Sequence, residues 1–74
     1  MSNNSTFGQR LAAAMGDIAA VTLAARIIEL GGECTERTVY RWLQGDSLPQ
    51  MDTLIFIGKA LDVSLDTLAG TDNA

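Results

Sequence analysis

Hydrophobic residues recur at intervals of three and four along most of the chain, which is the spacing of one face of an α-helix. The pattern predicts helices over residues 7–15, 18–30 and 36–44, and two more between residues 49 and 70. No stretch alternates apolar and polar residues in the way that a half-buried strand requires. The sequence therefore predicts an all-α fold, a compact bundle of five short helices.

The ends of the first two helices are marked by capping residues and glycines. Ser5 or Thr6 can cap the first helix, and Gly16 ends it by accepting a left-handed backbone. Asp17 is expected to accept hydrogen bonds at the start of the second helix, where its charge also suits the helix dipole. The segment 18–30 is so apolar that we expect it to be packed on most sides and to end at two glycines.

The third helix has the clearest boundaries and the strongest division into two faces. Thr35 is its expected N-cap and Gly45 its terminator. Val39, Trp42 and Leu43 follow the i, i+3, i+4 spacing of one buried stripe. The outward side is then polar and consists of Glu36, Arg37, Tyr40, Arg41 and Gln44.

The last two helices follow a loop over residues 45–50. Pro49 fits the first turn of a helix, so the fourth helix begins near Pro49 or Met51. Its expected core stripe consists of Leu54, Ile57, Gly58 and Leu61. Ile55 and Phe56 fall outside that stripe. Ser64 can cap the fifth helix, which ends at Gly70.

The composition limits the chemistry that the chain can perform. Its 74 residues suffice for one domain with a modest core. There is no His and one Cys, Cys34, so a His-based acid or base, a zinc site with several ligands and an internal disulfide all lack their parts. The string GDSL at 45–48 has no His to serve as its base and is attributed to chance. We expect no enzyme activity, no catalytic residue, no cofactor and no metal.

The charge is unevenly distributed. The formal net charge of −4 speaks against a nucleic-acid partner, because binding phosphates requires Lys and Arg. Residues 1–45, however, hold four Arg and four acidic residues, whereas residues 46–74 hold one Lys and five Asp. A nucleic-acid partner would therefore have to lie mainly away from residues 46–74.

The start of the chain, MSNNST, is polar and has no basic, apolar leader. The longest apolar stretch, residues 11–28, contains charges and falls short of the roughly 20 clean residues that span a bilayer. We expect a cytoplasmic protein without a membrane span. Residues 1–6 are expected to form a flexible arm, residues 7–70 the folded domain, and residues 71–74 a tail or the start of a linker.

About half of the chain, TERTVYRWLQGDSLPQMDTLIFIGKALDVSLDTLAG, resembles the second half of a lambda-repressor-like (XRE or Cro-type) helix-turn-helix domain. The resemblance rests on Thr35 ahead of Val39 and Trp42, on Gly45 and Pro49 around the loop, and on the closing ALDVSLDTLAG. It implies a five-helix DNA-binding domain over residues 7–70, in which the second and third helices form the helix-turn-helix. Members of the family are mostly phage repressors and bacterial transcription regulators. The connection ELGGECT before the third helix is longer than the family's tight turn.

The resemblance also implies which residues contact DNA, with a recognition helix at about 35–44 in the major groove. By position, Arg37 and Arg41 would each donate two hydrogen bonds to guanine, and Glu36 would accept one from cytosine. The residues expected to hold the phosphate backbone or make auxiliary contacts are Thr35, Thr38, Tyr40 and Gln44. A simpler interpretation leaves these side chains solvated, with Arg41 paired to Glu36.

A family member of this kind is expected to act as a homodimer on a near-palindromic DNA operator, with an anti-repressor or other regulatory protein as a further partner. The candidate dimer patch consists of Ile55, Phe56, Leu65 and Leu68. The same four residues would also suit the contact between the fourth and fifth helices. The competing hypothesis for function is a protein-interaction module of the antitoxin or anti-repressor-binding type, with weak or no DNA binding.

Overall fold

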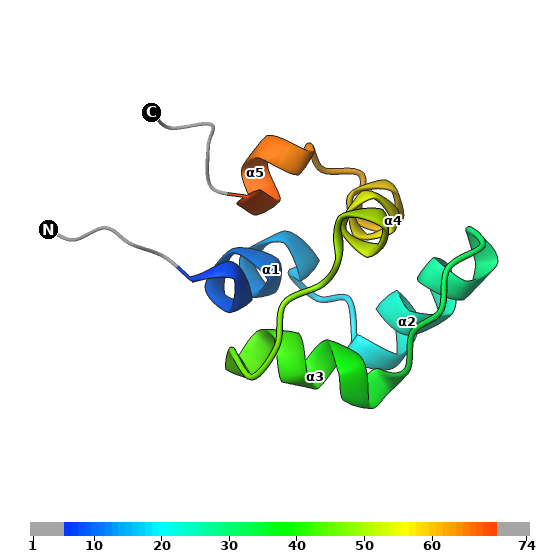
Figure 1. Ribbon diagram of the computed structural model, residues 1–74, viewed down its shortest axis with the longest axis horizontal. Helices are drawn as coiled ribbons and strands as arrows, with labels where there is room; N and C mark the ends of the chain where they lie inside the picture. The colour runs from blue at the N-terminus through cyan, green and yellow to red at the C-terminus, as the bar shows by residue number, and fades with distance from the viewer. Residues whose placement is uncertain (1–5, 70–74) are drawn as a thin grey trace, which may run out of the picture.

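The computed structural model describes residues 6–69, and within that range the chain forms five α-helices and no strand (Figure 1). The helices are α1 (Phe7–Met15), α2 (Ala20–Glu29), α3 (Glu36–Gln44), α4 (Met51–Leu61) and α5 (Leu65–Ala69). The predicted all-α fold of five short helices is confirmed. Most of the expected N-terminal arm, the expected stop at Gly70 and the tail 71–74 lie outside the described residues.

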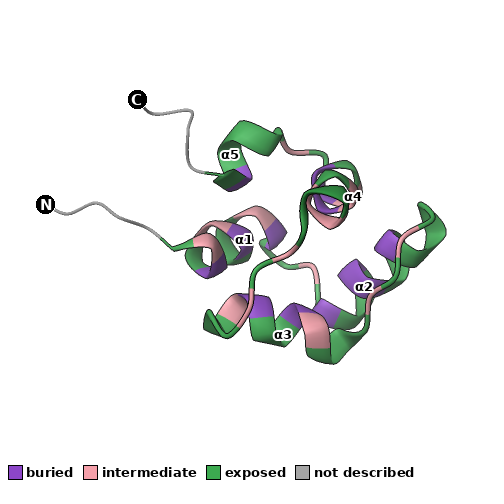
Figure 2. Cartoon of the chain, viewed as in Figure 1, coloured by how far each residue is buried: buried purple, intermediate pink, exposed green. Residues whose placement is uncertain are grey.

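The helices pack in a closed ring. α3 contacts α1 and α2, α2 also contacts α4, and α5 joins α4 back to α1. The ring encloses a core of apolar side chains, and the buried positions, purple in Figure 2, lie on the inward sides of the helices. The largest side chains without exposed surface are Leu11, Leu23, Ile27, Ile57, Leu68 and Val39. Each helix therefore has one face in the core and another in solvent.

Two of the predicted helices have the expected bounds to the residue because local signals define them. Thr6 caps α1 in a capping box with Gln9, in which each side chain bonds the other's backbone N–H. The Thr35 hydroxyl accepts from the Thr38 N–H at the start of α3, at 3.2 Å. Gly45 ends α3 in the left-handed conformation, with φ 85°.

The second helix differs from its prediction in its start. It begins at Ala20 rather than at residue 18, and its N-cap, Ala19, makes no side-chain bond. The Ile18 N–H bonds the Met15 carbonyl at 2.9 Å, so Ile18 belongs to the turn after α1. Asp17 is not the cap of this helix.

The packing of α2 also differs from its prediction. Ala20, Leu23, Ala24 and Ile27 form one buried stripe, while Val21 and Ile28 are more than half exposed. A helix on the edge of a ring contacts neighbours along one stripe only, so its remaining apolar residues stay at the surface. The expectation that α2 is packed on most sides is wrong.

Among the described residues, no single helix is long and apolar enough to cross a membrane, and α1 with α2 meet that test only together, across a bend of 88°.

Candidate nucleic-acid interface

The inner side of α3 is fixed by two neighbouring helices. Val39 and Trp42 are buried in the core, and Leu43 packs against it. α1 crosses so close that a Cβ on Gly8 would lie 2.5 Å from the Leu43 carbonyl oxygen. This contact and the ring leave α3 with a rigid inner face and an outer face turned to solvent.

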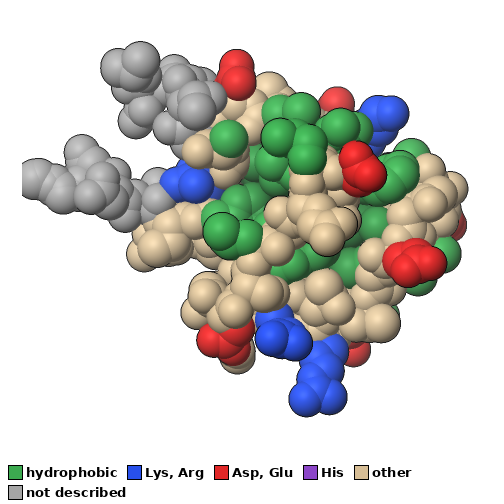
Figure 3. Space-filling view, viewed as in Figure 1, with side chains coloured by type: hydrophobic (Ala, Val, Ile, Leu, Met, Phe, Trp, Pro, Cys, Tyr) green, Lys and Arg blue, Asp and Glu red, His purple; other side chains and the backbone are tan. Residues whose placement is uncertain are grey.

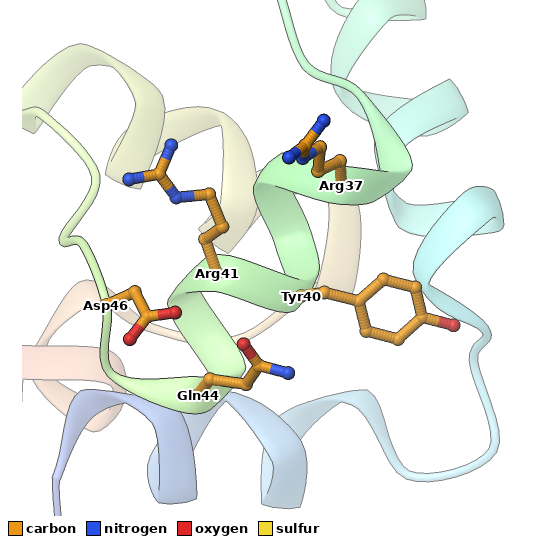
Figure 4. A pocket seen from close by; sticks show the side chains of 5 residues that line it. All are labelled: Arg37, Tyr40, Arg41, Gln44 and Asp46. Atoms are coloured by element: carbon orange, nitrogen blue, oxygen red, sulfur yellow. The ribbon is translucent and has the colours of Figure 1, made fainter.

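The outer face of α3 carries the polar residues that the sequence placed there. Glu36, Arg37, Tyr40, Arg41 and Gln44 are all exposed. Four of these and a loop residue line an open hollow of about 630 Å³, namely Arg37, Tyr40, Arg41, Gln44 and Asp46 (Figure 4). Arg37 and Arg41 project on the same side of the helix, and Tyr40 extends the other way. Two guanidinium groups therefore stand next to each other at the surface, one helical turn apart.

The four arginines divide into two pairs with different surroundings. The Arg10 Nε donates to the Leu68 carbonyl at 2.7 Å, and an Arg26 Nη1 donates to the Ala60 carbonyl at 3.1 Å. Both acceptors lie in the last turn of a helix, where carbonyls lack partners within the helix. These two arginines therefore tie α1 to α5 and α2 to α4.

Arg37 and Arg41 make no such tie. Neither guanidinium has a hydrogen bond or an ion pair with any residue in the described part of the chain. The pairing of Arg41 with Glu36 is not formed. All the donors of both side chains are thus directed at solvent, and they can bind a ligand without breaking a contact within the protein.

Thr35 and Thr38 are partly used by the fold. Their hydroxyl oxygens lie 3.0 Å apart in a hydrogen bond, and the Thr35 oxygen also accepts from the Thr38 N–H. One of the two hydroxyl protons is consumed in that bond, which leaves one for a phosphate oxygen. Thr38 is also half-buried. Their contribution to a ligand is therefore smaller than that of the arginines.

The acidic residues of the described range are spread around the ring, and three of them lie away from α3. Asp52, Asp62 and Asp66 are exposed on or beside α4 and α5. In Figure 3 two blue side chains lie at the bottom of the view with red ones close to them, and another blue side chain lies among red ones near the top. Glu36 lies on the outer face of α3 itself, and Asp46 lines the same hollow as Arg37 and Arg41. The local charge around α3 is therefore less positive than the two arginines alone would make it.

The candidate dimer patch is not present as predicted. Leu68 is a core residue without exposed surface, and Phe56 packs against the core. Its ring lies over Gly32, where a Cβ would come within 2.8 Å of the Phe56 Cδ2. Ile55 and Leu65 do keep about a third of their surface exposed. The prediction is corrected for Phe56 and Leu68, which pack within the ring of helices, as the alternative interpretation of these residues expected.

The sequence pattern did not indicate two apolar residues that are exposed at the surface. Leu48 is 72% exposed and Met51 is 66% exposed, the largest values among the large hydrophobic residues that the structure describes. Met51 lies at the edge of the buried stripe of α4, seven residues before the buried Gly58, a position that the helical spacing gives once the helix start is known.

Cys34 lies in the connection between α2 and α3. Burial raises the pKa of its thiol, although a hydrogen bond with the Thr35 carbonyl, at 3.5 Å, opposes the shift. A raised pKa lowers the thiolate fraction at neutral pH, and the thiolate is the reactive form. The thiol therefore has the environment of a structural residue.

Comparisons of the chain with family models, with curated proteins and with solved structures give no match. A function for the chain is therefore inferred from its fold and from the geometry of α3.

Proposed function

We propose that the chain binds double-stranded DNA in a sequence-specific manner, with α2 and α3 as a helix-turn-helix and the outer face of α3 in the major groove. One observation carries the proposal. Arg37 and Arg41 project from the same side of α3 without a partner in the described protein, whereas Arg10 and Arg26 are bonded to helix ends. An α-helix fits the major groove, and arginine is the side chain that most often reads guanine there.

The proposal gives each side chain a role. Arg37 and Arg41 each donate two hydrogen bonds to the N7 and O6 atoms of a guanine, and Glu36 accepts from a cytosine amino group. Side chains at the flanks of the helix bind phosphates and so position α3 without reading sequence. These flanking residues are Thr35, Thr38, Tyr40 and Gln44. We expect a preference for G·C base pairs at the positions that α3 reads.

The support of α3 favours this role. Reading base edges requires side chains held on a rigid element, because a loose helix loses the geometry of a bidentate contact. α3 is capped at both ends, and its inner side packs against α1 and α2. The acidity of α4 and α5 lowers the long-range attraction to DNA, so we expect a single copy to bind weakly.

The resemblance to lambda-repressor-like domains extends the proposal to a biological role. Under it, the chain is part of a transcription regulator of the phage-repressor kind, and the bound DNA is a near-palindromic operator. Two copies would then place their α3 helices in successive major grooves, about 34 Å apart.

A titration followed by fluorescence anisotropy tests the proposal. A duplex is first selected from a randomised pool and then compared with a scrambled duplex at two salt concentrations. Arg37→Ala and Arg41→Ala are each expected to lose about 1 to 3 kcal/mol of binding free energy and to relax the preference at particular base pairs. Ala13→Gln is the control, since it changes an exposed position of α1 that takes part in neither proposed contact and should change affinity little.

The same titration can reject the proposal. If no duplex binds above scrambled DNA at the lower salt concentration, α3 does not read sequence. The protein-interaction hypothesis would then be favoured, because association through an apolar surface is insensitive to salt, whereas DNA binding weakens steeply with it.

A further inference from the structure

The outer face of α4 presents apolar residues flanked by charges of both signs. Met51 is 66% exposed and Ile55 36% exposed, so both present apolar surface to solvent. Asp52 and Lys59 are both exposed and lie seven residues apart. Seven residues return a helix to within about 20° of the same direction. The carboxylate and the ammonium group therefore stand along one edge of the helix, separated by nearly two turns.

A hollow of about 320 Å³ lies beside this stripe, between α4 and α5. Its lining consists of Ile55, Gly58, Lys59, Asp62, Val63 and Leu65. Gly58 lets the start of α5 approach, since a Cβ there would lie 3.1 Å from the Val63 carbonyl oxygen and 3.3 Å from the Leu65 Cδ2. In Figure 3 hydrophobic surface gathers over α4 and α5, toward the top of the view. The hollow is therefore an open site with a largely apolar lining.

Met51 and the hollow beside Gly58 are separated along the helix by the same number of residues as Asp52 and Lys59. Met51 and Gly58 are also seven residues apart, so both lie along the other edge of the stripe. A second α4 can pack antiparallel against the outer face of the first, related to it by a two-fold axis that passes at the level between Ile55 and Phe56. A residue that lies a given number of positions before the axis in one helix is then opposite the residue that lies the same number of positions after it in the other. The edge of the first helix that carries a given residue meets the same edge of the second.

This arrangement matches shape and charge together. Met51 of one copy comes level with residue 60 of the other, beside the hollow that residues 58–62 help to line. Asp52 of one copy comes level with Lys59 of the other, and the same pair forms again across the axis. The face is thus complementary to itself, which is the requirement for an isologous dimer.

We propose that the outer face of α4 binds a second copy of this chain as an antiparallel two-fold dimer. Met51 of each copy occupies the hollow of the other, and two Asp52 to Lys59 ion pairs fix the register. α3 takes no part in the contact, so this inference does not rest on DNA binding. The contact also differs from the patch predicted from sequence, because Phe56 and Leu68 are held inside the ring.

Charge reversal in the full chain, without DNA, tests the dimer by sedimentation equilibrium and native mass spectrometry. Asp52→Lys leaves only cations along the edge of both copies, and Lys59→Asp leaves only anions. Each variant alone is expected to weaken the dimer by about tenfold or more, because two attractive pairs become repulsive. An equimolar mixture of the two variants restores both attractions, so it should form a heterodimer with about the affinity of the original chain. Asp17→Lys is the control, since it makes the same charge change far from α4 in sequence.

A second variant tests the fit of shape. Met51→Gln keeps an exposed side chain of similar length but removes the apolar tip, and it should weaken the dimer without changing the circular dichroism of the monomer. The proposal is overturned if the original chain stays monomeric throughout the concentration range. It is also overturned if a dimer forms but the variants with reversed charge associate as strongly as the Asp17→Lys control, because the contact would then lie elsewhere.

Discussion

α3 and α4 are both amphipathic helices with one side in the same core, yet their outer faces differ in a way that separates two kinds of partner. On α3 the two arginines project side by side, and neither guanidinium is paired with a residue that the structure describes, although Glu36 and Asp46 lie on the same face. On α4, Asp52 and Lys59 lie at positions that a second, antiparallel α4 would match. A face with unpaired arginines suits an anionic ligand, whereas a face whose charges match those of its own antiparallel copy suits a second copy of the chain. The contrast supports our two proposals, nucleic acid as the partner of α3 and a second chain as the partner of α4.

The contrast depends first on the buried side of α3. Trp42→Ala should reduce the free energy of unfolding by about 3 to 5 kcal/mol, because it empties a core position between α3 and its neighbours. Urea denaturation followed by circular dichroism measures the loss. A substitution on the outer face, Gln44→Ala, should leave the midpoint within a few tenths of a molar, in line with the small effect of most surface changes. Equal effects of the two substitutions would mean that α3 does not pack as described.

The next largest effect on stability is expected from a substitution where α1 crosses α3. Gly8→Ala improves helix propensity but puts a methyl group 2.5 Å from the Leu43 carbonyl oxygen, which belongs to the backbone and yields little. We expect a net loss of about 1 to 3 kcal/mol in unfolding free energy. Ala13→Gln, at an exposed position of α1, is the control. A Gly8→Ala variant as stable as the original chain would place α1 farther from α3.

A charge-conserving change separates base reading from attraction to phosphate. Arg41→Lys keeps the positive charge but loses the bidentate fork of the guanidinium. Affinity for the selected duplex should fall by about 1 to 2 kcal/mol, while affinity for scrambled DNA should change little. The anisotropy titration of both duplexes measures the difference. Equal losses on the two duplexes would indicate that Arg41 binds phosphate only.

The smallest expected effect concerns the start of α3. Thr35→Ala removes the side-chain oxygen that accepts from the Thr38 N–H, and such a cap contributes about 1 kcal/mol to stability. Thr22→Ala, at an exposed position within α2, should change stability less. Thermal unfolding of the two variants side by side measures this. If both shift equally, the Thr35 hydroxyl does not cap α3.

The sequence predicted the fold where local signals decide it. The bounds of α1 and α3 depend on threonine caps and on glycines that lie next to the helices, so they can be read without tertiary information. The start of α2 depends on the turn at Ile18, whose N–H bonds the Met15 carbonyl, and the sequence pattern carries no sign of that bond. The burial of Leu68 follows from closure of the ring through α1 and α5, which is a property of the whole chain.

The candidate site shows the same division. The outer residues of α3 were predicted from helical spacing, but their distinction from the other arginines was not. Arg10 and Arg26 bond carbonyls 58 and 34 residues away in the chain, and these partners are known only once the helices are placed. The close approach at Gly8 and the hollow beside Gly58 likewise arise where two helices cross.

The most direct test of the account is the ratio of affinities for the selected and the scrambled duplex, measured for the original chain and for the Arg37→Ala/Arg41→Ala double variant at one salt concentration. We expect the double variant to lose most of the ratio, which falls toward one, while Ala13→Gln keeps it. An unchanged ratio in the double variant would contradict the claim that the outer face of α3 reads DNA.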